Sequence, residues 1–158
     1  MVKLTDEQQA FWDQFCAETK HQGKPFNAEY FGGTDVADEL LGLVLKGQKQ
    51  ATCMLARWIN LYPEIEPKIG NLTIILDAKE KPHCVIKTTK VHIAPVNSVT
   101  KEFAWREGEG ERTREDWLRI HNKFFEAEAK EYGFDYTPED PAIFEEFEMV
   151  WPAPKSVT

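Results

Sequence analysis

The chain has 158 residues, a formal net charge of −8 at pH 7 and 42% hydrophobic residues. This length and composition predict one globular domain with a buried core rather than a disordered chain. The acidic balance disfavours indiscriminate binding to nucleic acid, so DNA is not an expected partner. No apolar run reaches the roughly 18 residues of a membrane span, and MVKLTDEQQAFW lacks the apolar stretch of a signal peptide. We therefore expect a cytoplasmic protein with no membrane partner.

The cysteines and histidines give no sign of a disulfide framework or a metal site. The three cysteines are far apart and odd in number, which fits reduced thiols: they are Cys16, Cys53 and Cys84. Cys53 is best interpreted as a buried, inert thiol, because free cysteine usually packs like a small hydrophobe. No two histidines stand at a ligand spacing, so the sequence predicts neither a metal nor a cofactor.

Two helices are predicted in the first third of the chain. Thr5 and Gln8 fit a capping box ahead of a helix over residues 6–20. Thr34 is the predicted cap of a second helix, and Gly47 stands where a left-handed glycine ends such a helix. The apolar face of this second helix repeats at helical spacing and comprises Val36, Leu40, Leu43 and Val44.

Three segments have the pattern of β-strands. NLTIILD reads as a strand over residues 71–77, and a longer or bent strand follows over 85–96, where apolar and polar residues alternate. A last strand is predicted in AIFEEFEMVW. ARWINLYP, residues 56–63, is expected to be a short irregular or helical segment that stops at its proline.

Two further helices lie between these strands. Residues 98–107 predict a short helix and GEGER a glycine-broken loop. Thr113 can cap a long helix that ends at Gly133. Its predicted apolar stripe consists of Trp117, Ile120, Phe124 and Phe125. This order of elements predicts an α+β fold, in which helices wrap a small curled sheet or open barrel.

The motif order resembles that of a known family. GxKxAT at residues 47–52 is followed about fifty residues later by EFAxxEGEG and WxxxH. In this order the motifs resemble the activating signal cointegrator homology (ASCH) domain family over roughly residues 31–151. The resemblance implies a PUA-like small β-barrel wrapped by helices, with a cleft that meets RNA or nucleosides. It divides the chain into an N-terminal helical extension (1–30), an ASCH domain (31–152) and a C-terminal tail (153–158).

The resemblance also implies an activity and its residues. Some members hydrolyse N4-acetylcytidine to cytidine and acetate, with a lysine and a threonine of the GxKxxT motif and a later glutamate. These fall on Lys49, Thr52 and Glu107. The glutamate is chosen over Glu109 and Glu111 by alignment through the preceding phenylalanine and alanine. Other members are assigned ribonuclease activity or are parts of transcription coactivators.

The residues themselves allow two schemes for amide hydrolysis. Lys49 and Thr52 converge only if the chain turns around residues 50–51, because side chains three apart on a strand point to opposite faces. A neutral lysine could take the threonine proton, with Glu107 orienting the lysine or donating a proton to the leaving nitrogen. Alternatively the lysine remains cationic and stabilises an oxyanion. The sequence leaves this choice open.

The competing interpretations are a ribonuclease on single-stranded RNA, metal-assisted or metal-free, and an RNA-binding module without catalysis. In a ribonuclease, Lys49 and Arg57 would hold phosphate and His121 would take the 2′-hydroxyl proton. His121 is explained more simply by core packing beside Trp117 at helical spacing. Several aromatic side chains could stack a base: Trp58, Tyr62 and Trp105. The predicted substrate-binding set is Arg57, Trp58, Glu109 and His121, and the predicted partner is a nucleoside or single-stranded RNA. The first hypothesis is a hydrolase that deacylates an N4-acylated cytidine-like nucleoside.

Overall fold

The fold is built on a single curled five-stranded sheet. The computed structural model describes residues 2–152, so the predicted tail at 153–158 lies outside the described residues. The sheet order is β1-β3-β4-β5-β2, and only the β1–β3 pair is parallel. The strands are β1 (Asn27–Glu29), β2 (Ala51–Leu55), β3 (Leu72–Leu76), β4 (Pro82–Pro95) and β5 (Pro141–Trp151). The predicted α+β class with a PUA-like barrel is confirmed, and the barrel remains open between β1 and β2.

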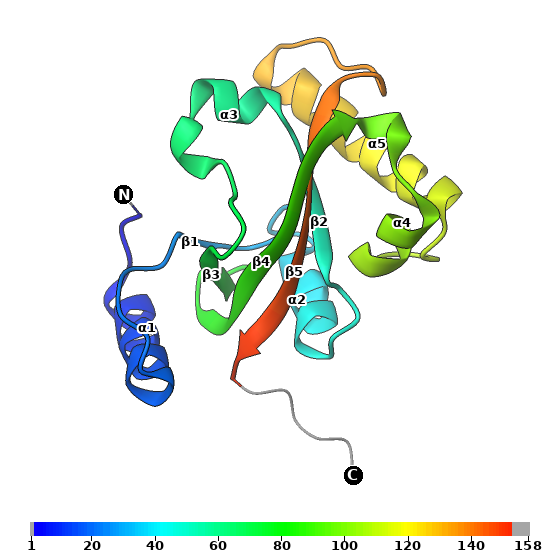
Figure 1. Ribbon diagram of the computed structural model, residues 1–158. Helices are drawn as coiled ribbons and strands as arrows, with labels where there is room; N and C mark the ends of the chain where they lie inside the picture. Colours follow the sequence, from blue (N-terminus) through cyan, green and yellow to red (C-terminus); the bar gives the residue numbers. More distant parts are fainter. Residues whose placement is uncertain (1, 153–158) are drawn as a thin grey trace.

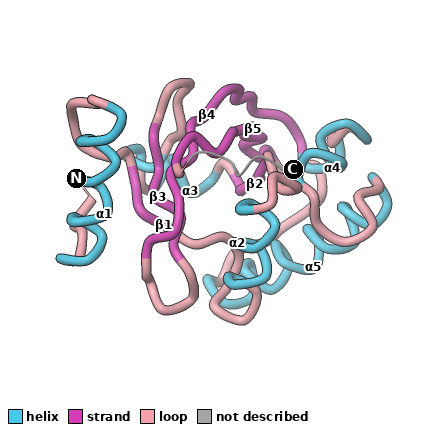
Figure 2. The backbone as a smooth tube through the Cα atoms, turned by 90° about the horizontal axis from the view of Figure 1, so that it is seen from below, coloured by secondary structure: helices cyan, strands magenta, loops and turns pink. Residues whose placement is uncertain are grey.

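Helices surround this sheet (Figures 1 and 2). In both views α1 lies at one end of the molecule, and α4 and α5 lie at the other. The α-helices are α1 (Asp6–Thr19), α2 (Ala37–Leu45), α3 (Arg57–Leu61), α4 (Lys101–Glu107) and α5 (Arg114–Tyr132). Two 3-10 turns, η1 (Pro63–Ile65) and η2 (Val96–Ser98), complete the connections. Within residues 2–152, none of the helices has the length and apolar character that crossing a membrane requires.

Local capping signals were read correctly at the longest helices. The Thr5 hydroxyl accepts from the Gln8 amide and the Gln8 side chain accepts from the Thr5 amide, so the capping box of α1 is confirmed. The Thr113 hydroxyl caps α5, and Gly133 ends it in the left-handed conformation. Both ends of α5 therefore follow from its own sequence.

Two local features differ from the sequence-based expectations. Helix α2 begins after Val36, which makes no side-chain capping bond, so Thr34 is not its cap. The segment that follows the first helix contains a strand, β1, that the sequence analysis did not predict. This strand has only three residues and pairs in parallel with the far-away β3, so no local alternation marks it.

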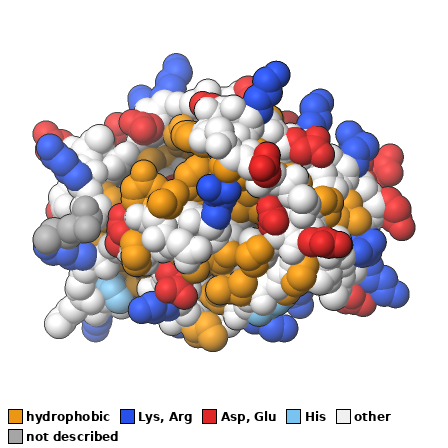
Figure 3. Space-filling view, turned by 90° about the horizontal axis from the view of Figure 1, so that it is seen from above, with side chains coloured by type: hydrophobic (Ala, Val, Ile, Leu, Met, Phe, Trp, Pro, Cys, Tyr) orange, Lys and Arg blue, Asp and Glu red, His pale blue; other side chains and the backbone are white. Residues whose placement is uncertain are grey.

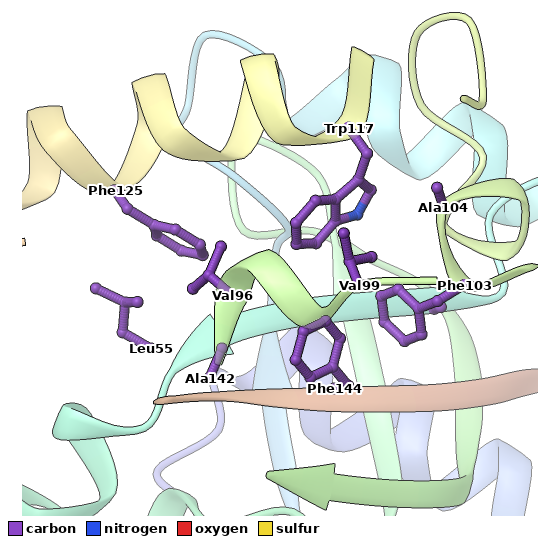
Figure 4. Close-up of a cluster of buried hydrophobic side chains, with 10 residues drawn as sticks. Leu55, Val96, Val99, Phe103, Ala104, Trp117, Phe125, Ala142 and Phe144 are labelled. Carbon is purple, nitrogen blue, oxygen red and sulfur yellow. The ribbon is translucent and has the colours of Figure 1, made fainter. Parts of the chain in front are cut away.

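The largest hydrophobic cluster fills the space between α5 and the sheet (Figure 4). Phe125 and Phe144 are each 1% exposed, and Phe125 points from α5 toward the sheet. The buried positions of α5 are Asp116, Trp117, His121, Phe125 and Ala129. The predicted stripe was therefore right at Trp117 and Phe125 and wrong at Phe124, which is 44% exposed. Two smaller clusters pack α2 and α1 against other parts of the sheet.

Candidate active site

A close approach of two backbone segments brings the motif residues together. The Gln50 amide donates to the Arg106 carbonyl at 2.7 Å, and the Gln48 side chain donates to the Gly108 carbonyl at 2.7 Å. Gly108 has φ +76°, and a Cβ there would lie 2.4 Å from the Gln48 carbonyl oxygen. Only glycine fits so near a neighbouring backbone in this conformation. The segment with Lys49 is thereby fixed against the end of α4.

Lys49 is buried at 2% exposure, and its Nζ lies among oxygen atoms. The Nζ–oxygen distance is 2.8 Å to the Glu109 carboxylate and 2.9 Å to the Ala51 carbonyl. Two longer contacts reach Glu107, at 3.5 Å to its carbonyl and 3.6 Å to its carboxylate. The Lys49 Nζ atom also lies 5.2 Å from the centroid of the Phe31 ring. The Lys49 side chain therefore forms buried ion pairs with both carboxylates.

Glu107 is held by α5 as well as by Lys49. Its carboxylate accepts a hydrogen bond from the Trp117 indole. It also pairs with His121 Nε2 at 2.8 Å. Burial opposes ionisation, but the charges of His121 and Lys49 and these hydrogen bonds outweigh it and lower the pKa of Glu107. Burial likewise opposes a charged imidazole, yet the Glu107 carboxylate raises the pKa of His121. The cluster therefore holds charges of both signs in a buried place.

The same groups have donor atoms that suit a metal ion. Ligand atoms of Glu107, Glu109 and His121 all lie within 4.8 Å of one another. The Lys49 ammonium is already paired with both carboxylates. The lysine thus supplies the positive charge that a cation would bring, and the arrangement is complete as an ion-pair cluster.

Thr52 lies on β2 and is not bonded to Lys49, the neighbour predicted from the sequence. In the antiparallel β2–β5 ladder its partner is Glu145. Within residues 2–152, the Thr52 hydroxyl has no side-chain hydrogen bond, and none joins it to Lys49. The Glu145 carboxylate accepts from the Thr88 hydroxyl at 2.6 Å. Thr52 is half-buried, and within residues 2–152 no side-chain hydrogen bond holds its hydroxyl.

The strand partner of Thr52, Glu145, and the β1 residue Glu29 both have a perturbed pKa. Burial raises the pKa of Glu145, and the hydrogen bond from Thr88 lowers it only in part. Loss of water around Glu29, together with the charge of Glu145, raises the pKa of Glu29 to about 7. The Glu29 residue is nevertheless exposed on β1, so solvent moderates this shift. Neither residue was singled out from the sequence, where Glu145-Glu146 looks like the polar part of an ordinary strand.

Cys53 points to the opposite face of β2 from Thr52, because successive strand residues alternate. Burial, and then the charge of Glu107, raise the pKa of its thiol well above the ordinary value. A thiol held protonated is a poor nucleophile. Cys53 is half-buried rather than buried, and the prediction of an inert thiol agrees with this raised pKa.

Arg57 and Trp58, two predicted substrate-binding residues, pack elsewhere. The Arg57 guanidinium stacks 3.5 Å from the Phe134 ring centroid, and its Nε has no hydrogen-bond partner within residues 2–152. The Trp58 indole donates to Glu128 at 2.7 Å. Glu128 follows Trp117 by eleven residues on α5, about 16 Å at the helical rise. The structure therefore gathers Lys49, Glu107, Glu109 and His121 and leaves Arg57 and Trp58 apart from them.

The curled α+β sheet with a lysine–carboxylate cluster at the end of α4 defines a PUA-like domain. The sequence model of the ASCH domain matches residues 27–151. The chain belongs to the ASCH domain family.

Solved structures agree with this assignment. The structure titled as an ASCH domain from Lactobacillus crispatus JV V101 superposes with a TM-score of 0.84 at 29% identity, covering 92% of this chain and 95% of that one. Protein EF3133 from Enterococcus faecalis V583 superposes with a TM-score of 0.82 at 32% identity, covering 90% and 86%. The hypothetical protein PH0355, at 15% identity and a TM-score of 0.51, shares the fold alone. No match was found among curated proteins.

Proposed function

We propose that this ASCH domain is a hydrolase that removes the acyl group from the N4 nitrogen of a cytidine-like nucleoside. The observation that carries the proposal is the buried Lys49 ammonium, fixed by Glu107 and Glu109 directly ahead of the strand that bears Thr52. A fixed charge in a water-poor site is suited to stabilising an oxyanion. The acetylcytidine hydrolases that the sequence resembles use the same residue types.

In this scheme Lys49 is the electrostatic group and Thr52 is the nucleophile. Thr52 Oγ1 attacks the acyl carbon, and the negative charge that develops on the acyl oxygen is stabilised by the ammonium. Two of the Nζ contacts are short, but those to Glu107 are 3.5 and 3.6 Å, so one N–H is weakly engaged and can turn toward the oxyanion. Glu107 and Glu109 position the lysine. Of the two schemes that the sequence left open, the ion pairs favour the cationic one.

A small neutral substrate fits the charge of the molecule better than a polyanion. The net charge is −8. On the face shown in Figure 3, hydrophobic side chains gather around a basic side chain near the centre, and acidic and basic side chains are interspersed over the rest. Such a mixture gives a phosphate backbone no continuous positive surface on the described part of that face. A nucleoside without phosphate avoids this repulsion.

Binding of single-stranded RNA is a second candidate, and one pocket favours it. A pocket of about 950 Å³ lies beside α4 and the start of α5. The exposed Trp105 ring carries the Arg112 guanidinium 3.5 Å from its centroid. The other basic side chains that line it are Lys101, Arg106 and Arg114, beside the acidic Glu102 and Glu115. An aromatic platform among cations is typical of sites that stack a base and hold phosphate.

The ribonuclease interpretation has less support. His121 is buried, and its two ring nitrogens are engaged by the Glu107 carboxylate and the Trp117 carbonyl. A general base needs a free nitrogen within reach of the 2′-hydroxyl. The geometry therefore favours a structural part for His121 in holding Glu107.

The test offers the pure protein N4-acetylcytidine, N4-benzoylcytidine and a single-stranded RNA. We expect release of cytidine from at least one acylated nucleoside, no cleavage of the RNA, and loss of turnover by 10²-fold or more in Thr52→Val. Thr19→Val, the same change on the distant α1, is the matched control. Absence of turnover together with RNA binding that weakens steeply with salt would instead establish the RNA-binding candidate.

A further inference from the structure

The proposed reaction needs a group that removes the proton from the Thr52 hydroxyl. Lys49 is unsuited, because two carboxylates and a carbonyl oxygen surround its ammonium. His121 is engaged through both ring nitrogens. The thiol of Cys53 lies on the opposite face of β2. The base must therefore come from the face of the sheet that carries Thr52.

The ladder between β2 and β5 brings a carboxylate beside Thr52. Its register is unbroken from Ala51 opposite Glu146 to Leu55 opposite Ala142, and it pairs Thr52 with Glu145. Directly opposed residues of antiparallel strands point to the same face, with their Cβ atoms about 4.5–5.5 Å apart. At this separation a glutamate carboxylate reaches a threonine hydroxyl by an ordinary rotamer change.

The atoms that would meet are both available. The Glu145 Oε2 atom accepts from the Thr88 hydroxyl at 2.6 Å, which orients the carboxylate. Within residues 2–152, no hydrogen bond engages the second Glu145 oxygen, Oε1, or the Thr52 hydroxyl. Catalytic hydrogen bonds are often incomplete before substrate binds and tighten in the complex. Thr88 thus holds one oxygen and leaves the other for Thr52.

This face also leads to the Lys49 ammonium. Phe147 stands two residues after Glu145 on β5 and so shares its face. The Phe147 ring stacks on Phe31 with centroids 5.5 Å apart, and Lys49 Nζ lies 5.2 Å from the centroid of that same Phe31 ring. The Lys49 ammonium therefore contacts one ring of an aromatic pair whose other ring shares the face of Glu145.

We propose that Glu145 is the general base and acid that serves Thr52, an assignment that rests on the proposed function. The Glu145 carboxylate takes the proton from Thr52 Oγ1 as that oxygen bonds to the acyl carbon. The bond from the acyl carbon to N4 then breaks, and Glu145 gives the proton to the departing nitrogen, which leaves as the free amine. In the second half, Glu145 takes a proton from water, the resulting hydroxide attacks the acyl ester, and Thr52 Oγ1 recovers the proton. The net reaction is amide plus water to amine plus carboxylic acid.

The acidity of the neighbouring groups supports this role. Burial raises the pKa of Glu145, which makes it a better proton acceptor than an exposed carboxylate. Glu29, whose pKa is raised to about 7 partly by the charge of Glu145, stands near it on the side of β1. A hydrogen bond from Thr88 keeps the ionised form accessible despite this burial.

Glu145→Gln is the direct test, because the amide keeps an oxygen for Thr88 but cannot accept a proton. We expect kcat for N4-acetylcytidine to fall by about 10²–10⁴-fold with KM nearly unchanged. Glu146→Gln is the matched control: this neighbour on the opposite face pairs with the half-exposed Arg106 and should retain wild-type kcat. Wild-type turnover in Glu145→Gln would overturn the assignment while leaving the proposed hydrolase intact.

A second measurement works even if the nucleoside substrate is wrong or Glu145→Gln is unstable. Mass spectrometry with peptide mapping follows acetylation of Thr52 by p-nitrophenyl acetate, an activated ester that needs no nucleoside pocket. We expect equal labelling rates in the wild type and Glu146→Gln, and a rate lower by about fivefold in Thr88→Val, which loses one orienting hydrogen bond but keeps the carboxylate. Equal rates in Thr88→Val and the wild type, or no label on Thr52 in any of these proteins, would contradict the assignment.

Discussion

Replacing Lys49 with methionine tests whether the buried cluster is an ion-pair network. Methionine has nearly the same length but no charge, so Lys49→Met leaves the Glu107 and Glu109 carboxylates facing each other without the cation between them. Lys49 is 2% exposed, so water does not replace the lost ammonium. Removing one partner from a buried ionic cluster costs about 3–5 kcal/mol. For a domain of this size that lowers Tm by roughly 6–20 °C.

The assay is urea unfolding followed by far-UV circular dichroism, with the midpoint and slope fitted separately. Lys49→Met/Glu109→Gln should recover part of the loss, because one of the two unpaired carboxylates is gone; the coupling expected is about 0.5–3 kcal/mol. Lys90→Met, which removes an exposed lysine 3.8 Å from Glu146, is the matched control and should change stability by no more than about 0.5 kcal/mol. A wild-type midpoint for Lys49→Met would refute the account of the cluster.

Three further changes have defined outcomes. Phe125→Ala should lower the free energy of unfolding by about 3–5 kcal/mol, and Phe124→Ala should lower it far less, because the two residues are 1% and 44% exposed. Equal denaturant midpoints for the two variants would show that the assigned buried face of α5 is wrong. Gly108→Ala should destabilise more than Gly133→Ala, because both have positive φ but only the first has a backbone atom in the way of a Cβ; equal thermal midpoints would argue against the close approach. The Glu29 pKa is raised to about 7 in the folded protein, so ionisation weakens folding as pH rises from the unfolded value toward 7 and above. Glu29→Gln should therefore be more stable than the wild type at pH 8 but not at pH 4. The gain should be smaller than the pKa shift alone implies, because Glu29 keeps contact with solvent. A stability difference that does not change with pH would contradict this.

Much of the fold follows from local patterns. The capping signals at Thr5 and Thr113 and the strand alternation of β4 and β5 are properties of contiguous residues, and the structure agrees with them. Strand β1 was not predicted, because its pairing with β3 spans more than forty residues and its three residues carry no alternating pattern. Phe124 was misplaced because one apolar stripe of a helix admits either of two neighbouring phenylalanines until the packing partner is known.

The candidate site depended far more on contacts distant in sequence. That Lys49 meets Glu107 and Glu109 depends on the approach of residues 48–50 to Gly108, which no local pattern gives. The residues came instead from the family resemblance. The pairing of Thr52 with Glu145 depends on the register of β2 and β5, which a one-residue slip would change. Sequence alone therefore predicted the residue types and not their neighbours.

The central claim is that Thr52 forms an acyl intermediate beside the Lys49 ammonium. The measurement that tests it most directly is intact-mass spectrometry, with peptide mapping, of protein mixed with N4-acetylcytidine and quenched by acid during turnover. The account predicts a transient mass increase of one acetyl group on Thr52, absent in Thr52→Val. Release of cytidine by Thr52→Val at the wild-type rate, with no acetyl group on Thr52 of the wild type at any time, would contradict it.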